Sequence, residues 1–203
     1  MSKSLQSTIP MNHQPMQFGD VTLRAATPEE RDSLYELVVR DTSWTAHNAP
    51  YLSSQCPTIE EFTQQHFTAL CLGEDKRLIT VNGQPVGTVS YYWESRESRW
   101  LDIGIVIYDP DYWAQGVGYN ALILWISHLF EEFDLPRIGL STWSGNIQML
   151  RCAHKLGLKE EGRVRCVRYY QGQYYDNVFM GVLKEEWNEI ISELELPINK
   201  NNM

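Results

Sequence analysis

The stretch from residue 100 to residue 120, WLDIGIVIYDPDYWAQGVGYN, constrains the fold more than any other part of the chain. It opens with an apolar run at 101–108, rich in Ile and Val, which is typical of a strand covered on both faces. An acidic, proline-containing break follows, and Gly116 and Gly118 then lead into an apolar helix at 121–133. Backbone N–H groups at a glycine-rich helix start can converge on an anion. The stretch therefore predicts a strand–turn–helix unit with a pyrophosphate site.

Two familiar nucleotide-binding motifs match these glycines poorly. Gly116-x-Gly118-x-x-Ala121 satisfies the dinucleotide fingerprint, but that fingerprint places its first glycine directly after the strand. The next predicted strand, 137–142, also ends in hydroxyl side chains instead of the acid that binds a ribose. No Gly-Lys-Ser/Thr follows, which excludes a P-loop. A tight turn that simply needs small residues is the alternative to a phosphate site.

Length and pattern predict a single domain. A chain of 203 residues can bury one substantial core, and no internal repeat or long linker divides it. We expect a flexible N-terminal tail at 1–17, one domain at 18–195 and a C-terminal tail at 196–203. Strands alternate with helices, and Asn82-Gly83 predicts a type I′ hairpin. The fold class is α/β, with a mixed, twisted sheet of about six to seven strands.

Local signals place the other elements of this domain. Two capping boxes, Thr27-x-x-Glu30 and Thr58-x-x-Glu61, predict helix starts, and the first has a proline at its first helical position. The remaining expected strands are 21–25, 77–81, 85–93, 137–142, 159–170 and 173–183, and the remaining expected helices are 146–156 and 185–194.

Composition restricts the classes of partner. The net charge of -9 disfavours nonspecific nucleic-acid binding and favours a cationic partner. The N-terminus lacks the apolar segment of a secretory signal, and the longest apolar stretch, 121–130, is too short to span a membrane. The cysteines are scattered without C-x-x-C pairs or clustered histidines, so neither a disulfide framework nor a metal site is expected. A cytoplasmic location is predicted.

Positive charge is concentrated between residues 151 and 168. A solvated helix face is the ordinary explanation for such a run. The run follows the strand next to the glycine turn, however, so a patch for an anionic cofactor is the functional interpretation. Its basic members are Arg151, Lys155, Lys159, Arg163, Arg165 and Arg168.

Three blocks of the sequence, at residues 113–121, 142–162 and 168–187, follow one another in a distinctive order and spacing. In this order and spacing they resemble the GNAT-superfamily N-acetyltransferases. Residues 113–121 (WAQGVGYNA) are similar to the W-G-Q-G-Y-G/A motif, and residues 142–162 are similar to the N-x-x-S/M, K-L-G-F and E-G block. Residues 168–187 resemble the closing hairpin of the branch that contains the ribosomal-protein N-terminal acetyltransferases. Together the blocks cover roughly residues 20–187.

The resemblance implies a GNAT-like fold, with helices on both faces of the sheet and a V-shaped splay between the strands at 101–107 and 137–142. Acetyl-CoA would lie in the V as a co-substrate, and no metal is needed. Strand residues would pair with the pantetheine, the turn at 115–119 and the helix start would hold the pyrophosphate, and two basic residues could meet the 3′-phosphate. The implied cofactor-binding residues are Ile105, Ile107, Gln115, Gly116, Val117, Gly118, Tyr119, Asn120, Asn146, Arg151 and Lys155.

Direct attack by an amine in a ternary complex requires that a proton leave the amine. An alkyl ammonium has a pKa of ~10 and an α-ammonium a pKa of ~8. Asp102 stands where many members of this branch carry Glu, so the resemblance makes it the candidate base or amine clamp, directly or through water. The alternative is a structural acid bonded to backbone or to Arg99. Glu161 is a second candidate, with an ordinary surface role as its alternative.

The general acid is unassigned by the resemblance. Many superfamily members carry a tyrosine seven residues after the asparagine, and Ala153 occupies that position here. Thr142 and Ser144 are hydroxyl candidates, although either could close the strand end by hydrogen bonds. A thiolate with a pKa near ~8.5, by analogy with cysteine, can also leave without an acid. The expected catalytic residues are therefore Asp102, Asn146 and Thr142.

The acceptor half of the site is predicted less closely. Trp44, His47 and Tyr51 lie in the irregular segment 41–57, where the family has its acceptor loop. They are candidates for substrate binding, and a satellite core under a long loop is the alternative.

Three functions are consistent with the sequence. The first is acetyl transfer from acetyl-CoA to a primary amine, with a protein N-terminal amine, on a basic protein, as the favoured acceptor. The second is acetylation of a polyamine or aminoglycoside. The third is a CoA-binding protein without catalysis. Exposed tyrosines in the closing hairpin could mediate a homodimer.

Overall fold

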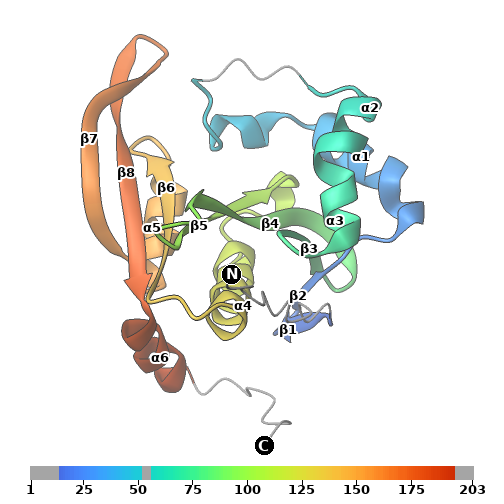
Figure 1. Ribbon diagram of the computed structural model, residues 1–203. Coiled ribbons are helices and arrows are strands. Elements are labelled where there is room, and N and C mark those ends of the chain that lie inside the picture. The colour runs from blue at the N-terminus through green and yellow to red at the C-terminus, as the bar shows by residue number, and fades with distance from the viewer. Residues whose placement is uncertain (1–13, 52–55, 195–203) are drawn as a thin grey trace, which may run out of the picture.

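A computed structural model describes residues 14–51 and 56–194, and its strands form one mixed sheet in the order β1-β2-β3-β4-β5-β6-β8-β7 (Figure 1). The strands are β1 (Met16–Phe18), β2 (Val21–Arg24), β3 (Lys76–Val81), β4 (Gln84–Ser95), β5 (Trp100–Ile107), β6 (Arg137–Trp143), β7 (Lys159–Tyr170) and β8 (Gln173–Leu183). The α-helices are α1 (Arg31–Arg40), α2 (Ile59–Phe62), α3 (Thr68–Leu72), α4 (Val117–Glu132), α5 (Ile147–Lys155) and α6 (Lys184–Glu193). Short 3-10 turns lie at Pro28–Glu30, Ser43–Ala46 and Pro110–Tyr112, and a π-helical turn at Thr63–Phe67 joins α2 to α3.

The expected α/β class is confirmed, but the sheet has eight strands instead of six to seven. The additional strand is β1, which pairs antiparallel with β2 so that Met16 lies opposite Leu23. Its first two residues fall inside the stretch 1–17 that we expected to be tail. A three-residue strand is too short to show an alternating pattern, and this explains why the sequence does not reveal it. Residues 1–13 and 195–203 lie outside the described residues.

Most local signals in the sequence predict the observed elements correctly. Thr58 forms its capping box with Glu61, and Glu30 caps the turn after β2 while also binding Arg24. Asn82 and Gly83 both have positive φ, 49° and 85°, as a type I′ turn requires. These signals succeed because they depend on neighbouring residues alone.

The sheet opens into a V between β5 and β6, as expected. These are parallel strands, and their only register pair is Asp102 with Gly139. By contrast, β5 pairs with β4 along its length, and β6 pairs with β8 from Arg137 to Trp143. Beyond Asp102 the two strands therefore diverge, each held in place by its other neighbour.

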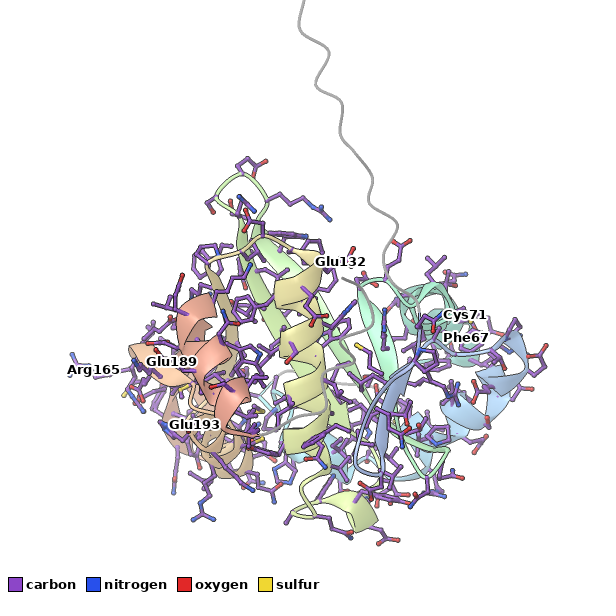
Figure 2. The ribbon with its side chains drawn as sticks, turned by 90° about the horizontal axis from the view of Figure 1, so that it is seen from below. Phe67, Cys71, Glu132, Arg165, Glu189 and Glu193 are labelled. Atoms are coloured by element: carbon purple, nitrogen blue, oxygen red, sulfur yellow. The ribbon has the colours of Figure 1, made fainter. Side chains whose placement is uncertain are left out.

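Helices cover both faces of the sheet (Figure 1). Two consecutive residues of β3 point to opposite faces of the sheet. Ile79 belongs to the larger hydrophobic core, with residues of α4, α5 and α6, whereas Leu78 belongs to a smaller core with residues of α1 and α3. Figure 2 shows α4 lying across the sheet with α6 beside it. Trp125 of α4 is fully buried, and its indole N–H donates to the carbonyl of Ser90 at 3.0 Å. Because α4 is held against the sheet in this way, the position of the glycine turn at its N-terminus is also set.

No helix in the described part of the chain is long and apolar enough to cross a membrane.

We predict that Gly87→Ala destabilises the fold, because the added Cβ would lie 2.2 Å from the backbone oxygen of Val106. Overpacking against backbone costs about 1–3 kcal/mol in unfolding free energy, measurable by urea unfolding followed by tryptophan fluorescence. Gly162→Ala is the matched control, since its Cβ would meet only a Phe179 ring carbon at 3.8 Å. Equal stability of the two variants would contradict the observed closeness of β4 and β5.

Candidate functional site

A cavity of about 510 Å³ lies between the diverging strands β5 and β6. Its lining comes from four segments far apart in sequence: β5, the glycine turn with the start of α4, the end of β6 with α5, and the loop after α1. Among the expected site residues, those in the lining are Trp44, His47, Tyr51, Ile105, Ile107, Gly116, Val117, Gly118, Tyr119, Thr142, Asn146, Arg151 and Lys155. Asp102, Gln115 and Asn120 lie outside it.

The backbone edge of β5 faces this cavity. Tyr108 donates its N–H to the carbonyl of Val86 at 2.9 Å, so the backbone groups of Tyr108 point towards β4. Backbone groups alternate in direction along a strand, so those of Ile107 and Ile105 point to the opposite, open edge. The Ile107 carbonyl accepts a hydrogen bond from the Trp113 indole at 3.0 Å. An extended ligand could therefore add to this edge as a strand, as expected from the sequence.

The glycine turn presents backbone donors to the cavity. Gly116 caps α4 with φ 84°, a left-handed conformation that favours glycine. The first bond of the helix runs from the N–H of Asn120 to the Gly116 carbonyl at 3.0 Å. The N–H groups of Val117, Gly118 and Tyr119 therefore precede the helical ladder, as the first donors of any helix do. Three successive donors and the positive end of a helix form an anion site.

The two expected contacts outside the lining are engaged elsewhere. The Gln115 side chain donates to the carbonyl of Asp111 within the turn. The Asn120 amide nitrogen lies near Gly19, between β1 and β2, and Asn120 is not part of the cavity lining. Neither side chain reaches the cavity, so the turn acts on it through main-chain groups.

Helix α5 forms the wall facing the turn. Its residues at spacings of three and four line the cavity, as expected for one face of a helix: Gln148, Met149, Arg151, Cys152 and Lys155. The Lys155 ammonium lies 4.4 Å from the centre of the Tyr119 ring, above the glycine turn. Of the basic run 151–168, Arg151 and Lys155 contribute positive charge to the cavity, and the remainder lies outside its lining.

Three of these lining residues, Gln148, Met149 and Cys152, were not expected from the sequence. Their helical spacing from Arg151 and Lys155 is the signal that could have identified them. Burial raises the pKa of the Cys152 thiol to about 11. This thiol is therefore protonated and unreactive near neutral pH.

Asn146 connects the cavity to the loop after α1. Its side-chain oxygen caps α5 by accepting the N–H of Met149 at 3.1 Å. Its side-chain nitrogen donates to the carbonyl of His47 at 2.8 Å, and the Trp143 indole donates to the same carbonyl at 3.4 Å. The His47 ring packs edge-on against Trp113, with centroids 4.8 Å apart. Through these contacts the loop spans the V from one arm to the other.

The aromatic residues of the loop after α1 differ in what they contact. Tyr51 lines the cavity and packs against Trp143 at 5.9 Å between ring centroids. Trp44 also lines the cavity, but it belongs to the smaller core through Tyr108, at 5.3 Å. Trp44 thus supports the loop as part of the smaller core, and substrate binding by the loop residues stays a prediction.

Asp102 lies at the base of the V and is completely buried. One carboxylate oxygen accepts from Arg137 at 3.1 Å and from the Trp100 indole at 3.0 Å. The other oxygen has no hydrogen-bond partner among the described residues. Burial and then the Asp102 charge raise the pKa of the adjacent Tyr92 to about 12. A proton could reach this carboxylate from the cavity only through an intervening group such as water.

The arginine that pairs with Asp102 is not Arg99, the partner suggested by the sequence. Arg99 instead donates to the backbone of Asp134, and Arg137 of β6 takes its place. Arg137 also binds Glu161, whose carboxylate lies 2.5 to 3.0 Å from its nitrogens. Glu161 is therefore more than a free surface acid, because Arg137 joins it to Asp102 across the base of the V.

The hydroxyl candidates divide clearly. Thr142 lines the cavity. Ser144 closes the end of β6 by accepting the N–H of Asp176 at 2.9 Å, which was its structural alternative. Ala153 is buried in the larger core. No three His, Cys, Asp or Glu side chains within 14–51 and 56–194 are grouped to hold a metal ion.

We predict that Arg137→Met lowers the unfolding free energy by about 3–5 kcal/mol, because it leaves Asp102 buried without its charge partner. The double variant Arg137→Met/Asp102→Leu should recover much of this loss, as removal of both charges ends the penalty. Arg163→Met, which removes surface pairs with Glu160 and Asp176, is the control and should cost about 1 kcal/mol or less for each pair. A double variant no more stable than Arg137→Met would contradict the coupling.

Comparison with known proteins agrees with this geometry. Residues 20–159 match the family model described as "Acetyltransferase (GNAT) domain". The chain is 25% identical over 173 residues to YdaF of Bacillus subtilis (strain 168), whose name assigns it provisionally to the ribosomal N-acetyltransferases; the match covers 82% of this chain and 93% of YdaF.

Two solved structures show the same fold at low sequence identity. RimL, a ribosomal L7/L12 alpha-N-protein acetyltransferase in complex with coenzyme A, has a TM-score of 0.68 at 18% identity, covering 84% of this chain and 98% of RimL. The ribosomal-protein-S5-alanine acetyltransferase from Vibrio fischeri has a TM-score of 0.69 at 18% identity, covering 86% of this chain and 98% of that one. The family match, together with the splayed sheet and the glycine turn, confirms the expected superfamily: the chain belongs to the GNAT family and is an acetyl-CoA-dependent N-acetyltransferase.

Proposed function

We propose that this enzyme acetylates the N-terminal α-amine of a protein. The observation that carries the proposal is the chemistry of the cavity: none of the described residues that line it is Asp or Glu. Its charged lining residues are Arg151 and Lys155, both basic. A polyamine or an aminoglycoside carries several positive charges and would need carboxylates close by. The lining offers such a polycation no compensation.

The protonation state of the amine supports the same acceptor. At pH 7.5 about a quarter of an amine with a pKa of ~8 is neutral, compared with about one in 800 for a lysine-like amine with a pKa of ~10.4. Because the lining holds no carboxylate, an amine that is already partly neutral needs the least help. An α-amine satisfies this requirement and a polyamine does not.

The cavity fits acetyl-CoA through groups already described. The N–H groups of Val117, Gly118 and Tyr119 would hold the pyrophosphate, with Lys155 above them and Arg151 available for a further phosphate. The open edge at Ile105 would bind the pantetheine, and its N–H would polarise the thioester carbonyl. Acetyl-CoA supplies the activated acetyl group. The protein supplies position, main-chain donors and exclusion of water.

Two predicted catalytic residues keep distinct proposed roles. Asp102 would influence the amine through water, since its side chain is buried beside Arg137. Thr142 lines the cavity and could donate its hydroxyl proton towards the departing sulfur. The Asn146 amide nitrogen donates one of its two N–H groups to His47 and the amide oxygen accepts from Met149, so the second N–H would be available to the pantetheine. We infer that Asn146 both positions the acceptor loop and offers its second N–H to the pantetheine.

The relatives support a protein acceptor. RimL and the Vibrio fischeri enzyme are named for acetylating ribosomal proteins, and both share this fold. The net charge of -9 favours approach of a basic protein at long range.

We predict that Gly116→Ala weakens acetyl-CoA binding by about tenfold or more. The φ of 84° strains any other residue, and relief of about 1–2 kcal/mol of strain would turn the three donors away from the phosphates. Gly172→Ala is the control, since Gly172 has φ 80° and equally open space but lies in the β7–β8 turn. Calorimetric titration measures both. Equal affinities in the two variants would remove the glycine turn from the cofactor site.

A panel of acceptors tests the proposed function. Thiol release from acetyl-CoA should be fastest with peptides bearing a free N-terminus, and absent with the same peptides blocked at the N-terminus but containing lysine. We expect kcat/KM to rise with pH through the pKa of the α-amine, near ~8. Turnover of spermine or an aminoglycoside alone would overturn the proposal. Binding of acetyl-CoA with no turnover on any amine would favour the non-catalytic alternative.

A further inference from the structure

The sheet face that points away from α4 carries a short polar row beside the cavity. Residues two apart in a strand share a face, and so do cross-strand partners. Ser141 therefore lies on the same face as Trp143, whose partner on β8 is Asn177. Arg168 of β7 lies on this face too, because it pairs with Tyr175, two residues before Asn177.

The row is connected from the cavity outward. Ser141 lines the cavity and accepts a hydrogen bond from the Asn177 amide at 3.0 Å. The Asn177 oxygen accepts from Arg168 Nη2, also at 3.0 Å. The guanidinium carbon of Arg168 lies 4.8 Å from the centre of the Tyr51 ring, and Tyr51 is itself a lining residue. Arg168 is thus held beside the acceptor loop by a side chain on each side.

Among the described residues Arg168 has no anionic partner, unlike Arg163 of the same strand. Arg163 binds both Glu160 and Asp176, whereas Arg168 forms no salt bridge with a residue in the described ranges. Its Nε is buried, and no described residue accepts its hydrogen. Leaving such a donor unsatisfied costs about 1–3 kcal/mol. The planar guanidinium fork matches a carboxylate, which can accept two parallel hydrogen bonds from it.

We propose that Arg168 binds a carboxylate of the acceptor, so that the preferred substrate is a protein N-terminus with an acidic side chain close to its α-amine. This proposal rests on the proposed function of N-terminal acetylation. Arg168 lies directly against the lining residue Tyr51, and Asn177 links it to the lining residue Ser141. An extended peptide advances about 3.3 Å per residue, so the acidic residue is expected at position two, three or four of the acceptor.

The test compares hexapeptides with free N-termini that carry Glu at position two, three or four with a parent that carries Gln at all three. We expect kcat/KM for one of the Glu peptides to exceed that of the parent at least tenfold, mainly through a lower KM. Arg168→Met should reduce this ratio to below twofold, and Arg168→Lys, which keeps the charge but loses the fork, should retain part of it.

Arg165→Met is the matched control. Arg165 belongs to the same strand, but it is exposed, and Figure 2 shows it at the outer edge of the molecule. This variant should retain the wild-type preference for the Glu peptide. If Arg168→Met does not fold, Arg168→Lys takes its place, and full retention of the ratio in that variant would count against the proposal.

Two results would overturn the inference: equal kcat/KM for the Glu and Gln peptides, or a ratio that survives in Arg168→Met. Failure of the proposed function looks different, because then no peptide would be acetylated at all. In that case 6-aminohexanoate and hexylamine, which differ by one carboxylate, replace the peptides in the same variants. Equal rates for these two amines would overturn the carboxylate site as well.

Discussion

The whole site depends on the single point where β5 and β6 meet. These neighbouring parallel strands share one register pair, Asp102 with Gly139, and an ion pair from Asp102 to Arg137 lies beside it. A Cβ on Gly139 would lie 2.1 Å from the guanidinium, so glycine is required for the arginine to lie flat against β6. The contact closes the base of the V while the outer strands hold its arms apart. Without this contact between β5 and β6, the cavity would not be closed at the base of the V.

This arrangement explains why the cofactor half of the site is built largely from main-chain groups. Where a strand diverges from the adjacent strand, its backbone donors and acceptors are exposed. A helix that starts at a left-handed glycine exposes three further backbone N–H donors. Such groups cannot move independently of the fold, so they are pre-organised at no further cost in side-chain entropy. Side chains such as Lys155 and Arg151 add charge at the rim. In the function that we propose, acceptor recognition instead depends on side chains and on the loop after α1.

The division between local and long-range contacts also decides what could be predicted. The hairpin at Asn82 and Gly83, the helix start at the glycine turn and the bounds of β2 to β8, to within two residues, depend on neighbouring residues and were predicted from the sequence. The ion-pair partner of Asp102 was not predictable from the sequence, because Arg137 is 35 positions away and Arg99 is much nearer along the chain. The bond from Asn146 to His47 spans 99 positions. Resemblance to a family predicts an acceptor loop in the segment 41–57, and the fold shows which residues hold that segment in place.

Two buried side-chain atoms in the described part of the chain have no hydrogen-bond partner, Asp102 Oδ2 and Arg168 Nε. Folded proteins rarely leave such atoms unsatisfied, and both residues lie on the sheet face away from α4. Along β6 they are ordered from the base of the V, at Gly139, to its outer end, at Trp143. In our proposals, Asp102 at the base would act through water on the leading ammonium of the acceptor, and Arg168 at the outer end would bind a carboxylate behind it. A peptide N-terminus followed by an acidic residue has this order of charges, whereas a polyamine has no carboxylate to offer.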